Sequence, residues 1–328
     1  MGNAFYPGIL SGYSYGSVMY DYLSMNGCDA SLVSSKDLRI GTTILQQLDS
    51  GSDKILLSSN IHVSKKNIFL PYLIKNVSGK KIAIIGLTNE RPVFDITEKT
   101  TSDLQIVPHT EVLKQVLADL QEKDKPDYII LLSGLKTEKN VEIINTYPAI
   151  SLIISGGDSK GNVYGKTASQ VIFPDGRRIL LVDSRKGYFK IEASLEQSVI
   201  VKDFSFQVPS AYDVKSRKYH LFVKRLNIWK KRYNEEMTLP FEKQPDLALE
   251  IGNLNIANLL RDKISTEISV LSKDTLNPLK IDQSSSMGYI SDNCNDDYYI
   301  FRYKLKGSEL KGLLNNPGYY IPGVDDGK

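Results

Sequence analysis

The sequence predicts an α/β fold in which two mixed sheets flanked by helices form a sandwich, followed by a helical linker and a partial α/β C-terminal domain. Three observations support this prediction. Apolar runs rich in β-branched residues, such as 81–87, are typical of strands covered on both faces. These runs alternate with segments whose apolar residues recur at helical spacing. A long basic segment of helical pattern then separates this part from the last section of the chain.

The elements of the first half follow from local patterns. Residues 16–27 place Val18, Met19, Tyr22 and Leu23 on one helical face, and Asn26-Gly27 gives a C-terminal stop. The predicted elements up to residue 90 are helix 16–27, strand 29–33, helix 42–48, strand 54–61 and strand 81–87.

The second half repeats this alternation and then changes. Thr110 is the expected cap of a helix, and Pro174-Asp175-Gly176 is the expected turn of a hairpin. The predicted elements are a helix from 110, strand 128–132, helix 138–145, a strand from 152, hairpin strands 171–173 and 178–182, and strand 199–206. The first domain is expected to span 1–207, a basic linker helix 208–240, and the C-terminal domain 241–328.

Composition limits the class of protein. A formal charge of +3 over 328 residues is too small to make nucleic acid the expected partner of the whole chain. The sequence contains no transmembrane segment and no basic leader followed by an apolar core. Cys28 and Cys294 lie too far apart in sequence to imply a disulfide framework, and histidine occurs only three times.

The most informative motif is the strand and turn at 152–160. Its apolar run ends in Gly156-Gly157-Asp158-Ser159-Lys160, at the strand end where α/β proteins build sites. The calcineurin-like metallophosphoesterases, and their 5′-nucleotidase branch especially, carry Gly-Gly-His-Ser-His there. The chain resembles this family also at 16–29, 58–61, 71–74 and 81–88, and in two C-terminal signatures at 256–261 and 305–314.

The resemblance implies a dimetal site whose ligand positions have changed. The bridging aspartate corresponds to Asn3, the metal-binding asparagine to Ser35 and the catalytic histidine to Lys36. A further histidine ligand corresponds to Gly134, and Asp158 and Lys160 stand for the last two. These are vestigial metal-site positions, so we expect no catalytic residue, no bound metal and no cofactor; the alternative is a divalent metal such as Mn or Zn.

The substituted positions suggest a different ligand chemistry. If Lys36 and Lys160 converge, they form with Arg39 a candidate anion-binding site for phosphate, sulfate or a carboxylate, with Asp37 and Asp158 nearby. The competing interpretation is a salt-bridged surface at a vestigial cleft. The family's substrate loop also falls on residues 272–277, which lack its glycines and arginine.

The leading hypothesis is a non-catalytic 5′-nucleotidase homologue, a pseudoenzyme that acts as a binding or scaffold protein. The alternative is a metal-dependent phosphohydrolase completed by an upstream segment or using an atypical site with Asp37 and Asp158. The partner is unknown: it is either a small phosphorylated or other anionic ligand or a protein. The family resemblance implies a periplasmic or cell-surface location with any signal upstream.

Other features of the sequence favour ordinary structural roles. His62 and His109 lack a ligand-spaced partner, and the acidic turn at 292–297 lacks the glycine and glutamate of a calcium loop. The basic segment 212–236 is expected to be a connecting helix with its aromatic stripe docked. The alternative is a helix that tracks phosphates or lies on a membrane surface.

Overall fold

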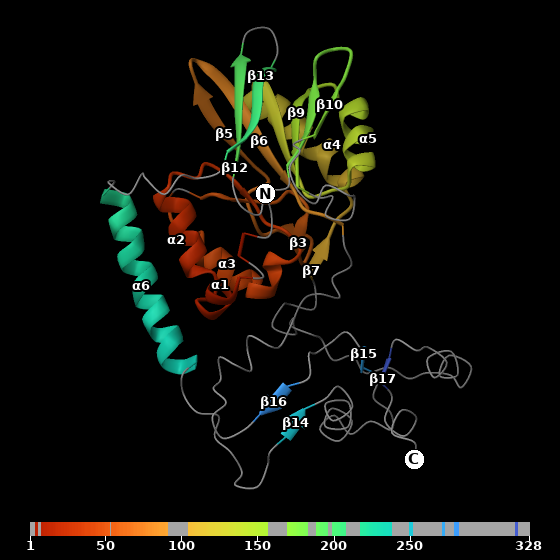
Figure 1. Cartoon of the computed structure of the whole chain (residues 1–328). Helices are drawn as coiled ribbons and strands as arrows, with labels where there is room; N and C mark the ends of the chain where they lie inside the picture. The colour runs from red at the N-terminus through yellow and green to blue at the C-terminus, as the bar shows by residue number, and fades with distance from the viewer. Residues whose placement is uncertain are drawn as a thin grey trace, which may run out of the picture. The chain divides into compact units, whose positions relative to one another are not determined.

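The structure of the chain is a computed structural model. It describes most of the first two thirds of the chain and parts of the last third (Figure 1). The described residues are 4–5, 8–52, 54–90, 104–156, 169–182, 188–195, 199–207, 217–237, 249–251, 271–272, 279–281 and 319–320. The chain divides into two compact units, Met1–Asn227 and Ile228–Lys328. This boundary lies inside the last helix, and the predicted limits 1–207, 208–240 and 241–328 remain predictions.

A six-stranded mixed sheet forms the centre of the first unit. Its order is β10-β11-β9-β8-β6-β5, with four parallel strands inside and an antiparallel strand at each edge. The strands are β5 (Tyr72–Val77), β6 (Lys80–Leu87), β8 (Tyr128–Ser133), β9 (Ile150–Ser155), β10 (Ser169–Ile172) and β11 (Arg178–Leu181). The apolar 81–87, 128–132 and 152–155 runs thus form the parallel centre, as expected of strands buried on both faces.

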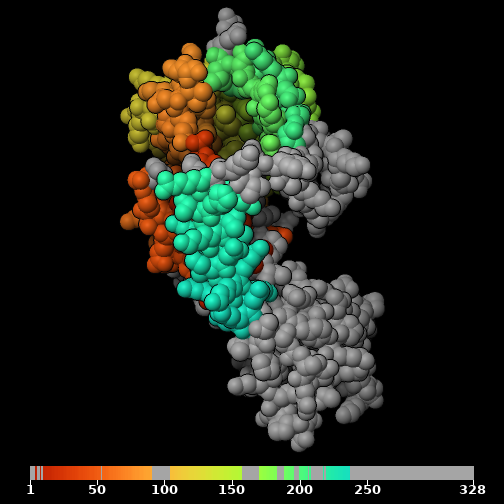
Figure 2. Space-filling view, turned by 60° about the vertical axis from the view of Figure 1, so that its left-hand side comes forward, coloured from red at the N-terminus to blue at the C-terminus, as the bar shows by residue number. Residues whose placement is uncertain are grey.

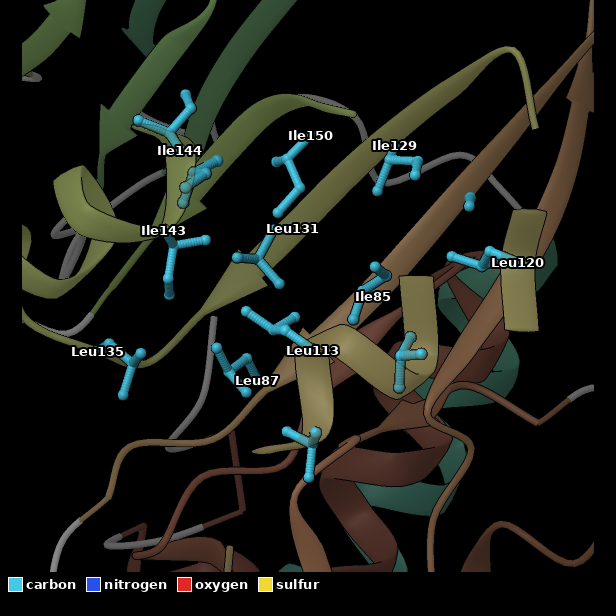
Figure 3. Close-up of a cluster of buried hydrophobic side chains, with 14 of the residues drawn as sticks. Ile85, Leu87, Leu113, Leu120, Ile129, Leu131, Leu135, Ile143, Ile144 and Ile150 are labelled. Atoms are coloured by element: carbon cyan, nitrogen blue, oxygen red, sulfur yellow. The ribbon is translucent and has the colours of Figure 1, made fainter. Parts of the chain in front are cut away.

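Alternate side chains of these strands enter two different cores. Ile85 and Leu131 point to the face covered by α4 (His109–Asp119) and α5 (Thr137–Thr146), where a large apolar cluster forms (Figure 3). Their neighbours Ile84 and Ile130 join the cluster on the opposite face. That face is covered by an antiparallel ribbon of β12 (Tyr188–Leu195) and β13 (Val199–Gln207), which contributes Val199 and Val201.

A smaller lobe precedes the sheet and has its own core around Phe5, Leu38 and Leu45. Its helical elements are α1 (Ile9–Tyr13), α2 (Ser17–Met25), the 3-10 helix η1 (Asp37–Ile40) and α3 (Thr42–Leu48). Its strands are the parallel pair β1 (Ser31–Leu32) and β2 (Leu56–Leu57) and the antiparallel group β4 (Lys66–Asn67), β3 (Ile61–Val63) and β7 (Leu104–Ile106).

The lobe joins the sheet where β2 crosses β6. A Cβ atom on Gly86 would lie 2.7 Å from the Cβ and 2.8 Å from the carbonyl carbon of Leu57, so only glycine allows this approach. The backbone N–H and the hydroxyl of Ser59 both donate to the Gly86 carbonyl, at 2.8 and 2.6 Å. The two cores are therefore held together by backbone contact.

Most predicted elements are present, with two corrections. The predicted strand 54–61 is wrong as a single element, since it is split into β2 and β3 by residues 58–60. Ser58 and Asn60 are fully buried and hydrogen-bonded to each other and to Thr88, so their side chains replace regular strand pairing. Helix α4 begins at His109 with Pro108 at the N-cap, so Thr110 is not the cap.

Few residues of the second unit are described. Helix α6 (Arg217–Met237) begins in the first unit and continues into the second. The described strands of the second unit pair antiparallel, β14 (Leu249–Ile251) with β16 (Leu279–Ile281) and β15 (Leu271–Ser272) with β17 (Tyr319–Tyr320). The predicted signatures 256–261 and 305–314 and the turn 292–297 lie outside the described residues. None of the described helices is long and apolar enough to cross a membrane.

The carboxylate of Asp49 is buried at the junction between α3 and β2. It accepts hydrogen bonds from Tyr20 Oη at 2.9 Å, Ile55 N at 2.8 Å and Leu56 N at 3.2 Å. Burial raises the pKa of Asp49 above its ordinary value of 3.8, and these hydrogen bonds offset only part of that effect. The folded protein therefore holds this proton more tightly than the unfolded chain.

We predict a pH dependence of stability from Asp49. Its contribution to the free energy of unfolding is fully present below about pH 4 and is lost as the pH rises through the raised pKa. Chemical denaturation of wild type and Asp49→Asn between about pH 4 and 7 should show a decline in wild type that the variant lacks. Asp127→Asn is the contrasting variant. A hydrogen bond from Lys81 N lowers the pKa of Asp127, so the contribution of Asp127 to stability is present above about pH 4 and is lost as the pH falls.

A second prediction concerns the junction of β2 and β6. Gly86→Ala should lower the free energy of unfolding by about 1–3 kcal/mol, because the added methyl meets the Leu57 backbone. The matched control is Gly12→Ala in α1, where an added Cβ meets nothing within 4 Å. Urea unfolding of both variants measures the difference, and equal stability would contradict the role given to Gly86.

Candidate functional site

The candidate site lies where the segments after β1, β6 and β8 meet at the carboxyl ends of their strands. Such ends are where open α/β sheets bind ligands. The three segments carry Ser35 and Lys36, Asn89 and Glu90, and Gly134. We call this region the carboxyl edge.

Asn60 and Thr88 hold the first two of these segments together. Asn60 Nδ2 donates to the Thr88 carbonyl at 2.9 Å, and Asn60 Oδ1 accepts from the Thr88 N–H at 2.8 Å. The side-chain amide thus pairs with Thr88 as a neighbouring strand would. The Thr88 hydroxyl in turn donates to the Val33 carbonyl at 2.5 Å, which fixes the end of β1 against the end of β6.

Asp37 caps the turn after β1. Its carboxylate accepts from the backbone N–H of Ser34 at 2.9 Å, while the Ser34 hydroxyl accepts from the Asp37 N–H at 3.2 Å. This reciprocal arrangement is a capping box. The carboxylate also accepts from the Ser34 hydroxyl at 2.7 Å and from Phe5 N at 2.8 Å, and Asp37 is fully buried. Both carboxylate oxygens of Asp37 are thus engaged by Phe5 N and by Ser34, while its part in an anion pocket or in an atypical catalytic site stays a prediction.

Asn89 lies next to two of the predicted site positions, Ser35 and Gly134. The backbone N–H of Ser35 donates to Asn89 Oδ1 at 3.2 Å. Gly134 donates its N–H to the Leu87 carbonyl at 2.8 Å, and a Cβ atom placed on it would lie 3.0 Å from Asn89 N. A side chain at position 134 would therefore push against the backbone of Asn89.

The remaining predicted residues differ in their surroundings. Ser35 is buried, and its hydroxyl has no hydrogen-bond partner among the described residues. Lys36 is the N-cap of the 3-10 helix η1 and Arg39 lies within it, and both side chains are partly exposed. Asn3, Asp158 and Lys160 lie outside the described residues, so the convergence of Lys36 with Lys160 remains a prediction.

Asn140 fixes the ends of β8 and β9. It is fully buried on α5, where its Oδ1 accepts from the Ser133 hydroxyl at 2.6 Å. Its Nδ2 donates to the Ser155 hydroxyl at 2.9 Å and to the Leu135 carbonyl at 3.1 Å. The residues just before Gly134 and Gly156 are thus held in place by one side chain that the motif analysis missed.

Glu90 and His109 form a pair beside the edge. Glu90 Oε1 accepts from the His109 backbone N–H at 2.6 Å and lies 2.5 Å from His109 Nδ1. The imidazole is buried, and its Nε2 has no hydrogen-bond partner among the described residues. His109 is thus a buried structural histidine, as predicted, although its carboxylate partner 19 positions away in sequence was missed. His62, also expected to be structural, lies 3.3 Å from the Ser59 carbonyl through Nε2.

Ser35, Lys36 and Gly134 do not supply the donors expected of a site for a pair of divalent metal ions, whereas Glu90 and His109 beside the edge carry a carboxylate and an imidazole. Such a site needs anionic oxygens and neutral imidazoles that converge. Ser35 offers a neutral hydroxyl, Lys36 a cation and Gly134 no side chain. Within the described ranges, no three His, Cys, Asp or Glu side chains gather to form a metal centre.

Solved structures show which fold this is. A 5′-nucleotidase precursor from Thermus thermophilus matches 85% of this chain and 61% of its own length, with a TM-score of 0.60 and 15% identity. A putative 5′-nucleotidase from Staphylococcus aureus matches 89% of this chain and 61% of its own length, with a TM-score of 0.63 and 13% identity. The fold is the α/β metallophosphoesterase type, as the sequence predicts.

Sequence relatives support a relationship to the 5′-nucleotidase family. Protein UshA from Yersinia enterocolitica is 31% identical over 159 aligned positions, and the match covers 44% of this chain and 29% of that protein. A 5′-nucleotidase from Vibrio cholerae is 30% identical over 122 residues, which are 37% of this chain and 22% of that protein. The chain is thus similar in part to proteins of the 5′-nucleotidase family, and its match spans less than a third of the length of these relatives. No family model matches the chain.

We predict different effects on stability for two substitutions at the carboxyl edge, Asp37→Ala and Ser35→Ala. Asp37→Ala should lower the free energy of unfolding by about 2–5 kcal/mol, because it leaves buried backbone donors of Phe5 and Ser34 unpaired. Ser35→Ala removes a buried hydroxyl without a partner among the described residues and should leave stability unchanged or slightly higher. Thermal and urea unfolding compare the two. A larger loss for Ser35→Ala than for Asp37→Ala would contradict the capping role of Asp37.

Proposed function

We propose that this protein is a non-catalytic 5′-nucleotidase homologue that acts as a binding or scaffold protein. The observation that carries the proposal is the chemistry of the carboxyl edge. The three described positions that correspond to metal-site residues are Ser35, Lys36 and Gly134, and none supplies an anionic or imidazole donor.

Two physical effects support loss of the metal site. An ammonium group at Lys36 would repel two dications at short range. At position 134, a Cβ atom would lie 3.0 Å from Asn89 N, so a ligand side chain there would require Asn89 to shift by a few tenths of an ångström. Asp37, the nearest carboxylate in sequence, is already bound by the backbone of Phe5 and Ser34.

Retention of the scaffold supports a binding role. Asn60, Asp37 and Asn140 each satisfy several buried polar groups around the edge. Networks of this kind fix a surface in one conformation, which lowers the entropic cost of binding a partner. The proposed partner is a protein or a small phosphorylated or other anionic ligand, and the proposed location is periplasmic or cell-surface, in line with the family resemblance.

The first test measures metal content and phosphohydrolase activity together. Purified protein should contain no stoichiometric Mn or Zn after incubation with either ion, and it should not hydrolyse AMP in their presence. The rival proposal, a metal-dependent phosphohydrolase, predicts stoichiometric metal with turnover. Asp158→Asn is the control for contamination, since an activity that belongs to the rival site should be lost in this variant while a contaminant's activity should remain.

The second test concerns a residual anion site at Lys36, Arg39 and Lys160. Calorimetric titration with inorganic phosphate and with AMP should give binding that Lys36→Ala weakens by about tenfold or more, as expected for loss of a charged hydrogen-bond donor. Lys114→Ala, at an exposed lysine of α4, is the matched control. Equal affinities of wild type and Lys36→Ala would reject the anion site and leave the non-catalytic proposal standing.

A further inference from the structure

Helix α6 presents two different stripes along its 21 residues. The first is a half-buried apolar stripe made of Phe222, Leu226, Trp229 and Tyr233. Phe222 packs edge to face on Tyr22 of α2, with ring centroids 5.3 Å apart. Arg225 beside it forms an ion pair with Asp21 at 2.5 Å. These contacts place the N-terminal half of α6 alongside α2 (Figure 1).

The second stripe faces away from these contacts and alternates basic and apolar residues. Its members recur at intervals of three and four positions, which puts them on one helical face. They are Arg217, Leu221, Lys224, Ile228 and Lys231, and all of them are exposed. Leu221 and Ile228 are each 48% exposed. The side chain of Lys231 is 78% exposed and forms an ion pair at 3.6 Å with Glu235, the next position on this helical face. Figure 2 shows α6, in turquoise, as part of the molecular surface. We call these five residues the outer stripe.

The charge of the chain is concentrated on this helix. Residues 217–237 contain seven Lys or Arg and two Glu, whereas the whole chain has a net charge of only +3. The rest of the chain is therefore net negative. A connecting helix that only needed to be solvated would require neither this excess of one sign nor two exposed branched aliphatic side chains among the lysines.

We propose that the outer stripe of α6 docks on an anionic phospholipid surface. The helix would lie in the plane of the interface, with Leu221 and Ile228 among the upper acyl chains and Lys224 and Lys231 at the level of the phosphates. Lysine side chains suit this position because their aliphatic stems follow the apolar residues while the ammonium groups stay in water. The proposal is independent of the carboxyl edge and of whether it binds an anion.

The apolar members of the stripe favour a lipid surface over nucleic acid. A nucleic-acid backbone attracts the lysines equally well, but single strands are gripped by stacking on exposed aromatic rings. None of the aromatic residues of α6 belongs to the outer stripe: Phe222, Trp229 and Tyr233 lie on the half-buried stripe. Tyr219, which is 42% exposed, lies three positions before Phe222 and thus on that side of the helix too. Exposed Leu221 and Ile228 gain free energy only where an apolar phase accepts them.

Vesicle flotation of the full chain tests the proposal. At about 0.1 M salt the protein should float with vesicles of phosphatidylcholine and phosphatidylglycerol and should not float with phosphatidylcholine alone. Lys224→Gln/Lys231→Gln should weaken binding by about tenfold or more. Lys114→Gln/Lys202→Gln removes the same charge from exposed positions elsewhere and should bind as wild type does. Circular dichroism and thermal melting establish that each variant is folded.

A third variant separates lipid insertion from simple charge attraction. Leu221→Gln/Ile228→Gln keeps every charge and the helix propensity and should also weaken vesicle binding by about tenfold. The proposal is overturned if vesicles do not bind, if the control double variant loses as much affinity, or if Leu221→Gln/Ile228→Gln binds as wild type does. It is also overturned if the protein binds a fluorescent oligonucleotide but not the anionic vesicles.

Discussion

The backbone contact between β2 and β6 at Gly86 is the constraint on which the rest of the first unit depends. The large apolar core of the sheet and the core around Phe5 and Leu45 are separate clusters. They meet where Leu57 approaches Gly86 closely enough to exclude a methyl group and where Ser59 donates twice to the Gly86 carbonyl. This contact sets the ends of β1 and β6 side by side, so that Thr88 reaches Val33 and Asn89 reaches Ser35.

In the proposed function, the carboxyl edge combines a structural framework with altered functional positions. The framework consists of Asn60, Asp37 and Asn140, which satisfy buried backbone and hydroxyl groups that would otherwise destabilise the strand ends. At the positions that would hold metal in the family, the described residues are a hydroxyl, an ammonium and a glycine. The framework residues and the functional positions are subject to different physical requirements. The framework is required for folding whether or not the edge carries out any chemistry.

The regular elements could be predicted from sequence because their signals are local. The periodicity of α4 and α5 and the β-branched runs of β6, β8 and β9 report burial within each segment. The break at 58–60 could not be predicted, because the partner of Asn60 is Thr88, 28 residues away. The pairing of Glu90 with His109 could not be predicted for the same reason, because the two residues lie 19 positions apart in sequence. A signal for Asp37 did exist, since Ser34 with an acidic residue three positions later is a capping-box pattern. That pattern predicts the capping role of Asp37, and its part in an atypical catalytic site stays a prediction.

The central claim is that the carboxyl edge keeps the family's scaffold without its pair of metal ions. The most direct test is an anomalous difference map from crystals of the protein grown in Mn²⁺. The account predicts no manganese peak between Ser35 and Gly134, with Asn89 still bound to the Ser35 N–H. Two manganese peaks at this edge, with Asn89 displaced to admit them, would contradict it.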